Sequence, residues 1–270
     1  MSTEHAIEIP RLSLKFEVHL VDHCNLNCYG CGHFAPISKA KYADIIQFEC
    51  DMQRMAVLFK DKVYRINLLG GEPLLHPEIN KLMEISRRYF AVEDIVLISN
   101  GVNLAKMRKQ FWLSCKVNNV RIEITRYPIN INYERLLSEA STAEVKLSFF
   151  GSTEKSNRTF VHLPLDLSGS QNSTCNFYTC YMANDCTIVR DGRLFPCPVV
   201  AFIDKFNEKF SRNLLIDHKD YVNLYEDLTS ETIFDFLCRP IPFCRYCDVN
   251  SRTTNHPWKK SQGRIEEWLS

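Results

Sequence analysis

Residues 22–36 read Asp-His-Cys-Asn-Leu-Asn-Cys-Tyr-Gly-Cys-Gly-His-Phe-Ala-Pro. Within them, Cys24, Cys28 and Cys31 have the spacing C-x3-C-x2-C and follow residues 14–21, whose alternating apolar side chains predict a strand. Three thiolates in a loop that leaves a strand can surround one [4Fe–4S] cube, which has four irons to ligate. One iron would stay open for a ligand that is not protein. The alternatives are a zinc knuckle and three buried thiols.

A second motif, Gly70-Gly71-Glu72-Pro73, directly follows the apolar run 65–69. Together the two motifs resemble the radical SAM superfamily, in which the cysteine motif follows the first strand of an α/β barrel. The resemblance implies that the open iron chelates the amino and carboxylate groups of S-adenosylmethionine. The superfamily usually has an aromatic residue just before the third cysteine. Here that residue is Gly30, and Tyr29, one place earlier, is the candidate for the adenine contact.

Composition restricts the class of protein. The 270 residues carry 33 Lys and Arg against 32 Asp and Glu, a net charge of +1, without the basic block of a nucleic-acid-binding protein. No apolar run approaches the 18 or so residues of a membrane span. Twelve cysteines without a secretion signal favour metal ligation in a reducing compartment. We therefore expect a cytoplasmic metalloprotein that binds neither nucleic acid nor membrane.

Apolar runs and helical patterns alternate along the first part of the chain, which predicts parallel βα units. Strands are expected over 14–21, 65–69, 94–99, 120–125 and 145–149, and helices over 46–59, 77–89, 103–112 and 133–140. Five or six such units predict an α/β fold with a partial (β/α)6 TIM-like barrel over residues 1–165. Residues 166–270 would form a small C-terminal auxiliary-cluster domain with a β-hairpin and a helix.

Working residues of α/β barrels lie on loops at the carboxyl ends of the strands. By the resemblance, Gly70-Gly71-Glu72-Pro73 would bind the methionyl amino group, because glycines allow close approach and a carboxylate pairs with an ammonium. Ser99 and Asn100 are candidates for the ribose hydroxyls, and a simple turn is the alternative. Arg126 could face the cofactor carboxylate or an anionic part of the substrate, and a solvated surface arginine is the alternative.

A Ser/Gly/Asn/Gln stretch over 165–173 indicates a domain boundary, and cysteines become frequent beyond it. Asp191-Gly192 predicts a β-hairpin between Cys186 and Cys197. Far along the chain, Cys244 and Cys247 form a C-x2-C pair.

This layout resembles the twitch domain, a shortened SPASM domain that holds an auxiliary [4Fe–4S] cluster. The resemblance implies a second [4Fe–4S] cluster ligated by Cys180, Cys197, Cys244 and Cys247, with Cys186 or Cys175 as substitutes for Cys180. The alternative is a four-cysteine zinc ribbon.

Overall size and cysteine layout are similar to deoxy-scyllo-inosamine dehydrogenase, a twitch-domain enzyme. The resemblance implies that a 5′-deoxyadenosyl radical oxidises the alcohol of a sugar, cyclitol or nucleotide-linked sugar. The auxiliary cluster would accept one electron, and flavodoxin or ferredoxin would reduce the enzyme. No residue is identified as a catalytic acid or base.

Three other functions remain open. An epimerase would need a thiol that returns a hydrogen atom, for which Cys115, Cys186 and Cys50 are candidates. A peptide-modifying maturase and, outside catalysis, a zinc-bearing binding module are the others.

Overall fold

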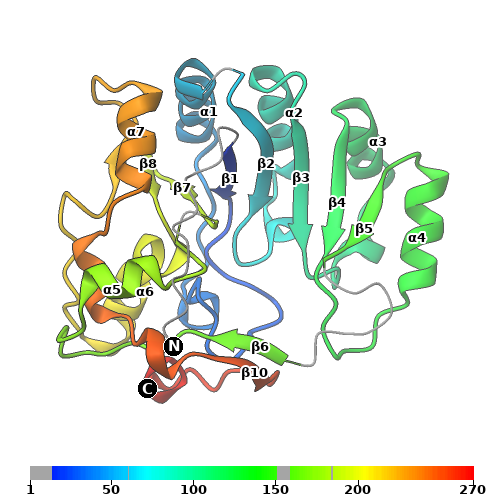
Figure 1. The fold of residues 1–270 in the computed structure, drawn as a ribbon. Helices are drawn as coiled ribbons and strands as arrows, with labels where there is room; N and C mark the ends of the chain where they lie inside the picture. The colour runs from blue at the N-terminus through cyan, green and yellow to red at the C-terminus, as the bar shows by residue number, and fades with distance from the viewer. Residues whose placement is uncertain (1–13, 60, 151–158, 184) are drawn as a thin grey trace, which may run out of the picture.

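The computed structural model describes residues 14–59, 61–150, 159–183 and 185–270. Within these ranges, the central sheet has eight strands in the order β5-β4-β3-β2-β1-β7-β8-β9 (Figure 1). The strands that run parallel are β1 (Leu14–His19), β2 (Val63–Leu69), β3 (Asp94–Ser99), β4 (Val120–Ile124), β5 (Leu147–Phe149) and β7 (Ile188–Arg190). This parallel array confirms the expected α/β fold with a partial TIM-like barrel.

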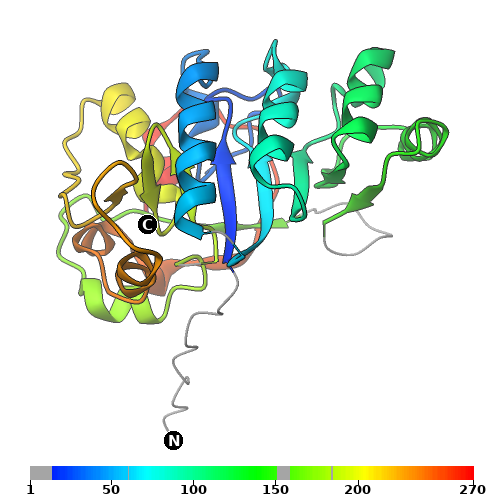
Figure 2. The ribbon, with the colours of Figure 1, turned by 90° about the horizontal axis from the view of Figure 1, so that it is seen from above.

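Helices cover one face of this sheet, and α1, α2 and α3 stand in a row along it (Figure 2). The four helices between the parallel strands are α1 (Ile45–Phe59), α2 (Ile79–Tyr89), α3 (Lys109–Val117) and α4 (Tyr133–Thr142). Phe16 and Val18 of β1 are buried in the same core as Met52 and Met55 of α1. Strand alternation and helical spacing therefore place these apolar side chains in one layer.

Several element boundaries differ from the expectation by a few residues, and the structure explains two of them. The segment 103–112 forms a single 3₁₀ turn, Leu104–Lys106, and α3 begins only at Lys109, because Met107 and Arg108 are extended with ψ of 137° and 162°. β5 begins only at Leu147. Val145 still closes the end of α4, because its amide donates a hydrogen bond of 2.9 Å to the Ala140 carbonyl.

The predicted hairpin is confirmed, and its position was not foreseen. β7 pairs with β8 (Arg193–Phe195) across Asp191 and Gly192, whose φ angles of 50° and 75° are the left-handed values that such a tight turn requires. β8 pairs with β9 (Val222–Asn223), while β7 pairs with β1. The hairpin thus extends the barrel sheet, and the division of the chain near residue 165 stays a prediction.

The C-terminal half adds α5 (Ser173–Tyr178), α6 (Pro198–Phe210) and α7 (Ser230–Leu237). A second cluster of buried apolar side chains includes Phe202, Phe243 and Trp268 from this half and Phe34 from the cysteine loop. The core of the C-terminal half therefore continues directly into the loop that carries the first three cysteines.

A two-stranded antiparallel sheet, β6 (Thr159–His162) with β10 (Thr253–Pro257), lies outside the main sheet (Figure 1). It carries the last part of the chain toward the cysteine loop. There Cys28 and Lys260 form an isolated antiparallel β-bridge, and the Tyr29 amide donates a hydrogen bond of 2.9 Å to the Lys259 carbonyl. The described part of the chain has no helix with the length and apolarity needed to cross a bilayer.

Candidate active site

The structure brings Cys24, Cys28 and Cys31 together in the loop after β1. Burial raises the pKa of Cys24 to about 11 and that of Cys28 to about 12, and the neighbouring Cys31 adds to both shifts. Burial also raises the pKa of Cys31, which the backbone amides of residues 33–35 partly oppose. Thiols in this state ionise only when a positive centre binds them, so metal binding would release protons here.

Several N–H groups point at these sulfurs. The Leu26 amide lies 3.4 Å from Cys24 Sγ, and Asn100 Nδ2 lies 3.5 Å from the same atom. Trp258 Nε1 lies 3.2 Å from Cys28 Sγ. Hydrogen bonds to cysteine sulfur are among the means by which proteins tune iron–sulfur clusters, so this donor set fits the expected group.

Convergence on a single ion is not the arrangement found. The described residues contain no group of three or more His, Cys, Asp or Glu side chains placed to hold one metal ion. Zinc needs such convergence, because its ligands share one centre at about 2.3 Å for sulfur. A cubane cluster does not, because each thiolate binds a different iron.

The two glycines of the second motif allow the cysteine loop to pass directly against β2. A Cβ on Gly70 would lie 2.6 Å from the Val21 carbonyl oxygen, and one on Gly71 would lie 2.1 Å from that of His23. The Gly71 amide donates a hydrogen bond of 2.6 Å to the Val21 carbonyl oxygen. The Glu72 amide donates one of 3.0 Å to the His23 carbonyl oxygen. The motif thus holds the loop that presents the cysteines.

Glu72 is fully buried, and Pro73 follows it as the start of a 3₁₀ helix, Pro73–Leu75. The Glu72 carboxylate accepts hydrogen bonds from the Ser99 hydroxyl at 2.8 Å and from the amides of Asn100 and Leu74 at 2.9 and 3.0 Å. Burial raises its pKa to about 7. The carboxylate therefore ties the second motif to the loop after β3, and the contacts of these residues with S-adenosylmethionine stay predictions.

Arg126 and Tyr29 both lie against aromatic or basic neighbours. The Arg126 guanidinium is 3.6 Å from the ring centre of Phe149, the side chain is half-buried, and its Nε has no partner. The Tyr29 ring stacks on His256 with centres 5.0 Å apart, and Lys259 Nζ lies 4.0 Å from its centre. Neither side chain is fully solvated, and their roles toward the cofactor stay predictions.

A second group of cysteines lines a cavity in the C-terminal half. Cys180, Cys197, Cys244 and Cys247 border this cavity together with Arg252 and apolar side chains. Burial raises the pKa of Cys197 to about 11 and that of Cys247 to about 12, with further contributions from the other thiols. Cys175 and Cys186 do not border this cavity.

Local structure positions two of these cysteines. Cys197 precedes the first turn of α6, and the amides of Val199 and Val200 donate to it, which favours the thiolate. The buried Asn176 side chain donates to the carbonyl oxygens of both Cys244 and Cys247, at 2.9 Å for Cys244. This amide fixes the turn between the two cysteines.

Known proteins resemble this chain at three levels. Residues 15–140 match the family described as a 4Fe-4S single cluster domain. GTP 3′,8-cyclase from Heliobacterium modesticaldum is 26% identical over 93 residues, which are 34% of this chain and 28% of the cyclase. Molybdenum cofactor biosynthesis protein 1 from Bos taurus is 29% identical over 93 residues, 34% of this chain and 15% of that protein. The chain thus matches less than a third of the length of these curated relatives.

A solved structure extends the likeness to the whole fold. BtrN in complex with AdoMet and 2-DOIA superposes with a TM-score of 0.54, covering 90% of this chain and 95% of BtrN at 16% identity. The two sequence motifs, a matching family and a shared fold now agree. The chain belongs to the radical SAM superfamily.

Two residues to which the sequence assigned no role contact the cysteine loop. Trp258 and Tyr127 both form hydrogen bonds to Cys28, which oppose the upward shift of its pKa. Tyr127 lies on the loop after β4 that the barrel rule selects, although no role was predicted for it. Trp258 lies 230 residues after Cys28 and outside any motif, so no local signal could have found it.

The three candidate thiols lie in different parts of the fold. Cys115 is buried among the helices, 3.7 Å from Met83 Sδ, and Cys50 is exposed on α1. Cys186 precedes β7, where Glu17, Asp185 and Lys15 act on its thiol electrostatically. Barrel enzymes react at the carboxyl ends of the strands, whereas Cys186 lies before the amino end of β7, so its role as a hydrogen-atom donor stays a prediction.

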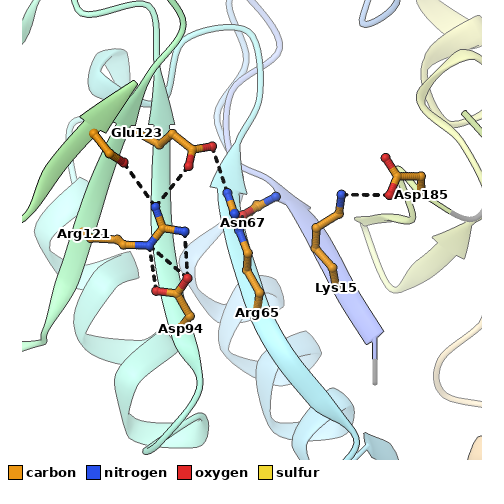
Figure 3. Close-up of polar contacts among 8 residues, drawn as sticks. Lys15, Arg65, Asn67, Asp94, Arg121, Glu123 and Asp185 are labelled. Carbon is orange, nitrogen blue, oxygen red and sulfur yellow. Dashed lines mark hydrogen bonds and ion pairs between the residues drawn. The ribbon is translucent and has the colours of Figure 1, made fainter. Parts of the chain in front are cut away.

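Polar side chains cover the inner face of the barrel sheet (Figure 3). Arg121 pairs with Asp94 at 2.8 Å and with Glu123 at 3.1 Å, and Glu123 also pairs with Arg65 at 3.0 Å. Figure 3 shows that this network runs across β2, β3 and β4, and that Lys15 of β1 pairs separately with Asp185. The partners satisfy one another across the inner face, from Asp94 at the amino end of β3 to Glu123 near the carboxyl end of β4.

Proposed function

We propose that this radical SAM enzyme oxidises an alcohol of a small polyhydroxylated substrate, such as a sugar, cyclitol or nucleotide-linked sugar. The observation that carries the proposal is the cavity lined by Cys180, Cys197, Cys244 and Cys247, separate from the three cysteines after β1. Two sets of thiols support two clusters with different functions. Three thiols leave one iron of a cubane cluster without a protein ligand, and four thiols leave none.

In this proposal, Cys24, Cys28 and Cys31 hold the first [4Fe–4S] cluster. The second [4Fe–4S] cluster is held by Cys180, Cys197, Cys244 and Cys247. S-adenosylmethionine lies against Gly70-Gly71-Glu72-Pro73, Ser99, Asn100, Arg126 and Tyr29. When bound, these groups supply a 5′-deoxyadenosyl radical that takes a hydrogen atom from the carbinol carbon, and an acceptor for the one electron that leaves with a proton as the ketone forms.

The protein's own contribution is to orient and to exclude water. The Gly-Gly-Glu-Pro loop fixes the cysteine loop through two backbone hydrogen bonds, and Glu72 fixes the loop after β3. Four thiolates at the second cavity leave no ligand position for a substrate, which favours electron acceptance there over substrate binding. A reduced flavodoxin or ferredoxin in the cytoplasm would supply the starting electron.

The BtrN structure supports the architecture of this proposal. Its two bound molecules, AdoMet and 2-DOIA, are ligands of BtrN. At 16% identity the likeness concerns the fold, so the substrate class proposed for this chain is an inference from the two cysteine sets.

Epimerisation is the alternative reaction, and it would need a thiol that returns a hydrogen atom to the substrate radical. Cys186 precedes the amino end of β7, and its substitution tests this role. A Cys186→Ser variant separates the two reactions: it keeps ketone formation if the enzyme is a dehydrogenase, and loses turnover without losing cofactor cleavage if it is an epimerase.

The decisive experiment is iron and sulfide analysis after anaerobic purification. We compare the wild type with a Cys24/Cys28/Cys31→Ala variant and a Cys180/Cys197/Cys244/Cys247→Ala variant. Two cubane clusters predict about eight irons in the wild type and about four in each variant. Cleavage of S-adenosylmethionine to 5′-deoxyadenosine should disappear in the first variant. A wild type with about four irons that all disappear in the first variant would refute the second cluster.

A further inference from the structure

Arg252 is a cation at the wall of the second cysteine cavity. It directly follows a 3₁₀ turn, Val249–Ser251, and borders the cavity together with the four cysteines. Its Nη1 donates a hydrogen bond of 3.0 Å to Cys180 Sγ. The sequence motif did not include this residue.

The guanidinium lacks the usual kind of partner. Among the described residues, the principal groups that act on it electrostatically are the thiols of Cys180, Cys247 and Cys197, and no carboxylate is among them. Its Nε is enclosed without a hydrogen-bond partner, and the ring of Tyr181 lies 5.9 Å from Cζ. Enclosing a charge without a counter-charge is costly, so this cation needs an anion that the side chains around it do not supply while the thiols are protonated.

We propose that Arg252 is the counter-ion of the second [4Fe–4S] cluster and raises its reduction potential. This inference rests on the proposed function, because it needs the four cysteines to hold a cluster. Four thiolates and four sulfides outweigh the iron charge, so such a cluster is anionic in both oxidation states and more so when reduced. A fixed cation that donates to a ligand sulfur stabilises the reduced state more, and hydrogen bonds and net charge are known to set these potentials.

Arg252 would thereby make the second cluster a better acceptor for the electron that leaves the substrate radical. The residue acts through the cluster and does not touch the reacting carbon, so it is a positioning residue. Its effect should appear in the potential of the cluster before it appears in turnover.

The test uses the full-length chain with Cys24, Cys28 and Cys31 changed to Ala, so that only the second cluster can contribute a signal. Arg252→Gln removes the charge, and Arg252→Lys keeps it without the planar donor pair. Arg212→Gln is the matched control, because Arg212 is exposed just beyond the far end of α6. The midpoint potential is measured by an anaerobic redox titration followed by electron paramagnetic resonance.

We expect the potential to fall in Arg252→Gln, to fall less in Arg252→Lys, and to stay unchanged in Arg212→Gln. Iron retained in Arg252→Lys and lost from a folded Arg252→Gln would also support the counter-ion role. An unchanged potential in Arg252→Gln, or iron lost from both folded variants, would overturn the inference and leave the proposed function intact. A parent variant without iron would overturn both.

Discussion

Replacing Gly71 by Ala tests whether the Gly-Gly-Glu-Pro motif is needed to hold the cysteine loop. The new Cβ would lie 2.1 Å from the His23 carbonyl oxygen and 2.4 Å from its carbonyl carbon. Both atoms belong to the backbone, and no rotation of a side chain can relieve the contact. The segment after β1 must therefore move away from the end of β2.

The size of the effect follows from that movement. Bringing the 2.1 Å contact to the 3.0 Å lower limit of real contacts needs a shift of about 0.9 Å. This shift would strain or break the hydrogen bonds from the Gly71 amide to Val21, 2.6 Å, and from the Glu72 amide to His23, 3.0 Å. Two hydrogen bonds at about 1 kcal/mol each, with about 1–2 kcal/mol of overpacking, predict a loss of about 3–4 kcal/mol in the free energy of unfolding.

Urea denaturation of the cofactor-free protein measures this loss, and iron analysis of the reconstituted protein measures whether the first cluster still assembles. Gly32→Ala is the matched control, because Gly32 follows Cys31 and its new Cβ would meet only the Leu163 side chain, at an ordinary 3.4 Å. We expect Gly71→Ala to lose about four of about eight irons and the control to lose none. Equal stability of the two variants within about 0.5 kcal/mol, with full iron in both, would refute the reasoning.

Two further predictions concern other parts of the fold. Burial raises the pKa of Glu17 from 4.5 to about 7, so between these pH values the folded protein keeps a proton that the unfolded chain has released, and stability should fall as the pH rises. At 1.36 kcal/mol per pH unit, the free energy of unfolding falls by up to about 3 kcal/mol. Glu17→Gln should remove this pH dependence in urea titrations at pH 4.5 to 8. A parallel fall in both proteins would contradict the assignment of the pH dependence to Glu17. Asn176→Leu removes the donor to the Cys244 and Cys247 carbonyls and should cost about 2 kcal/mol in the free energy of unfolding. An equal, near-zero cost in the exposed control Asn213→Leu and in Asn176→Leu would show that this amide does not stabilise the turn.

Local patterns in the sequence predicted much of the barrel and its first motif loops. The strands over 65–69, 94–99 and 120–125 were located within two residues of their observed bounds. The turn at Asp191-Gly192 was also predicted, because it depends on the φ values of two adjacent residues. Cysteine spacing and the Gly-Gly-Glu-Pro motif identified the superfamily for the same reason: their chemistry is carried by residues a few positions apart.

The tertiary structure decided what depends on distant segments. It added the hairpin to the barrel sheet through β1 and β7, placed Trp258 on Cys28, and joined Phe34 to the C-terminal core. It also grouped Cys180, and neither Cys175 nor Cys186, with the late cysteines.

Arg252 shows the physical reason most clearly. It lies 72 positions after Cys180, and nothing near it in the sequence distinguishes it from a surface arginine. Its proposed role depends on its position beside the cysteine sulfurs. The packing of α5, α6 and the C-terminal segment creates that position. The sequence by itself predicts which thiols would hold iron, and the fold determines which charges surround those thiols.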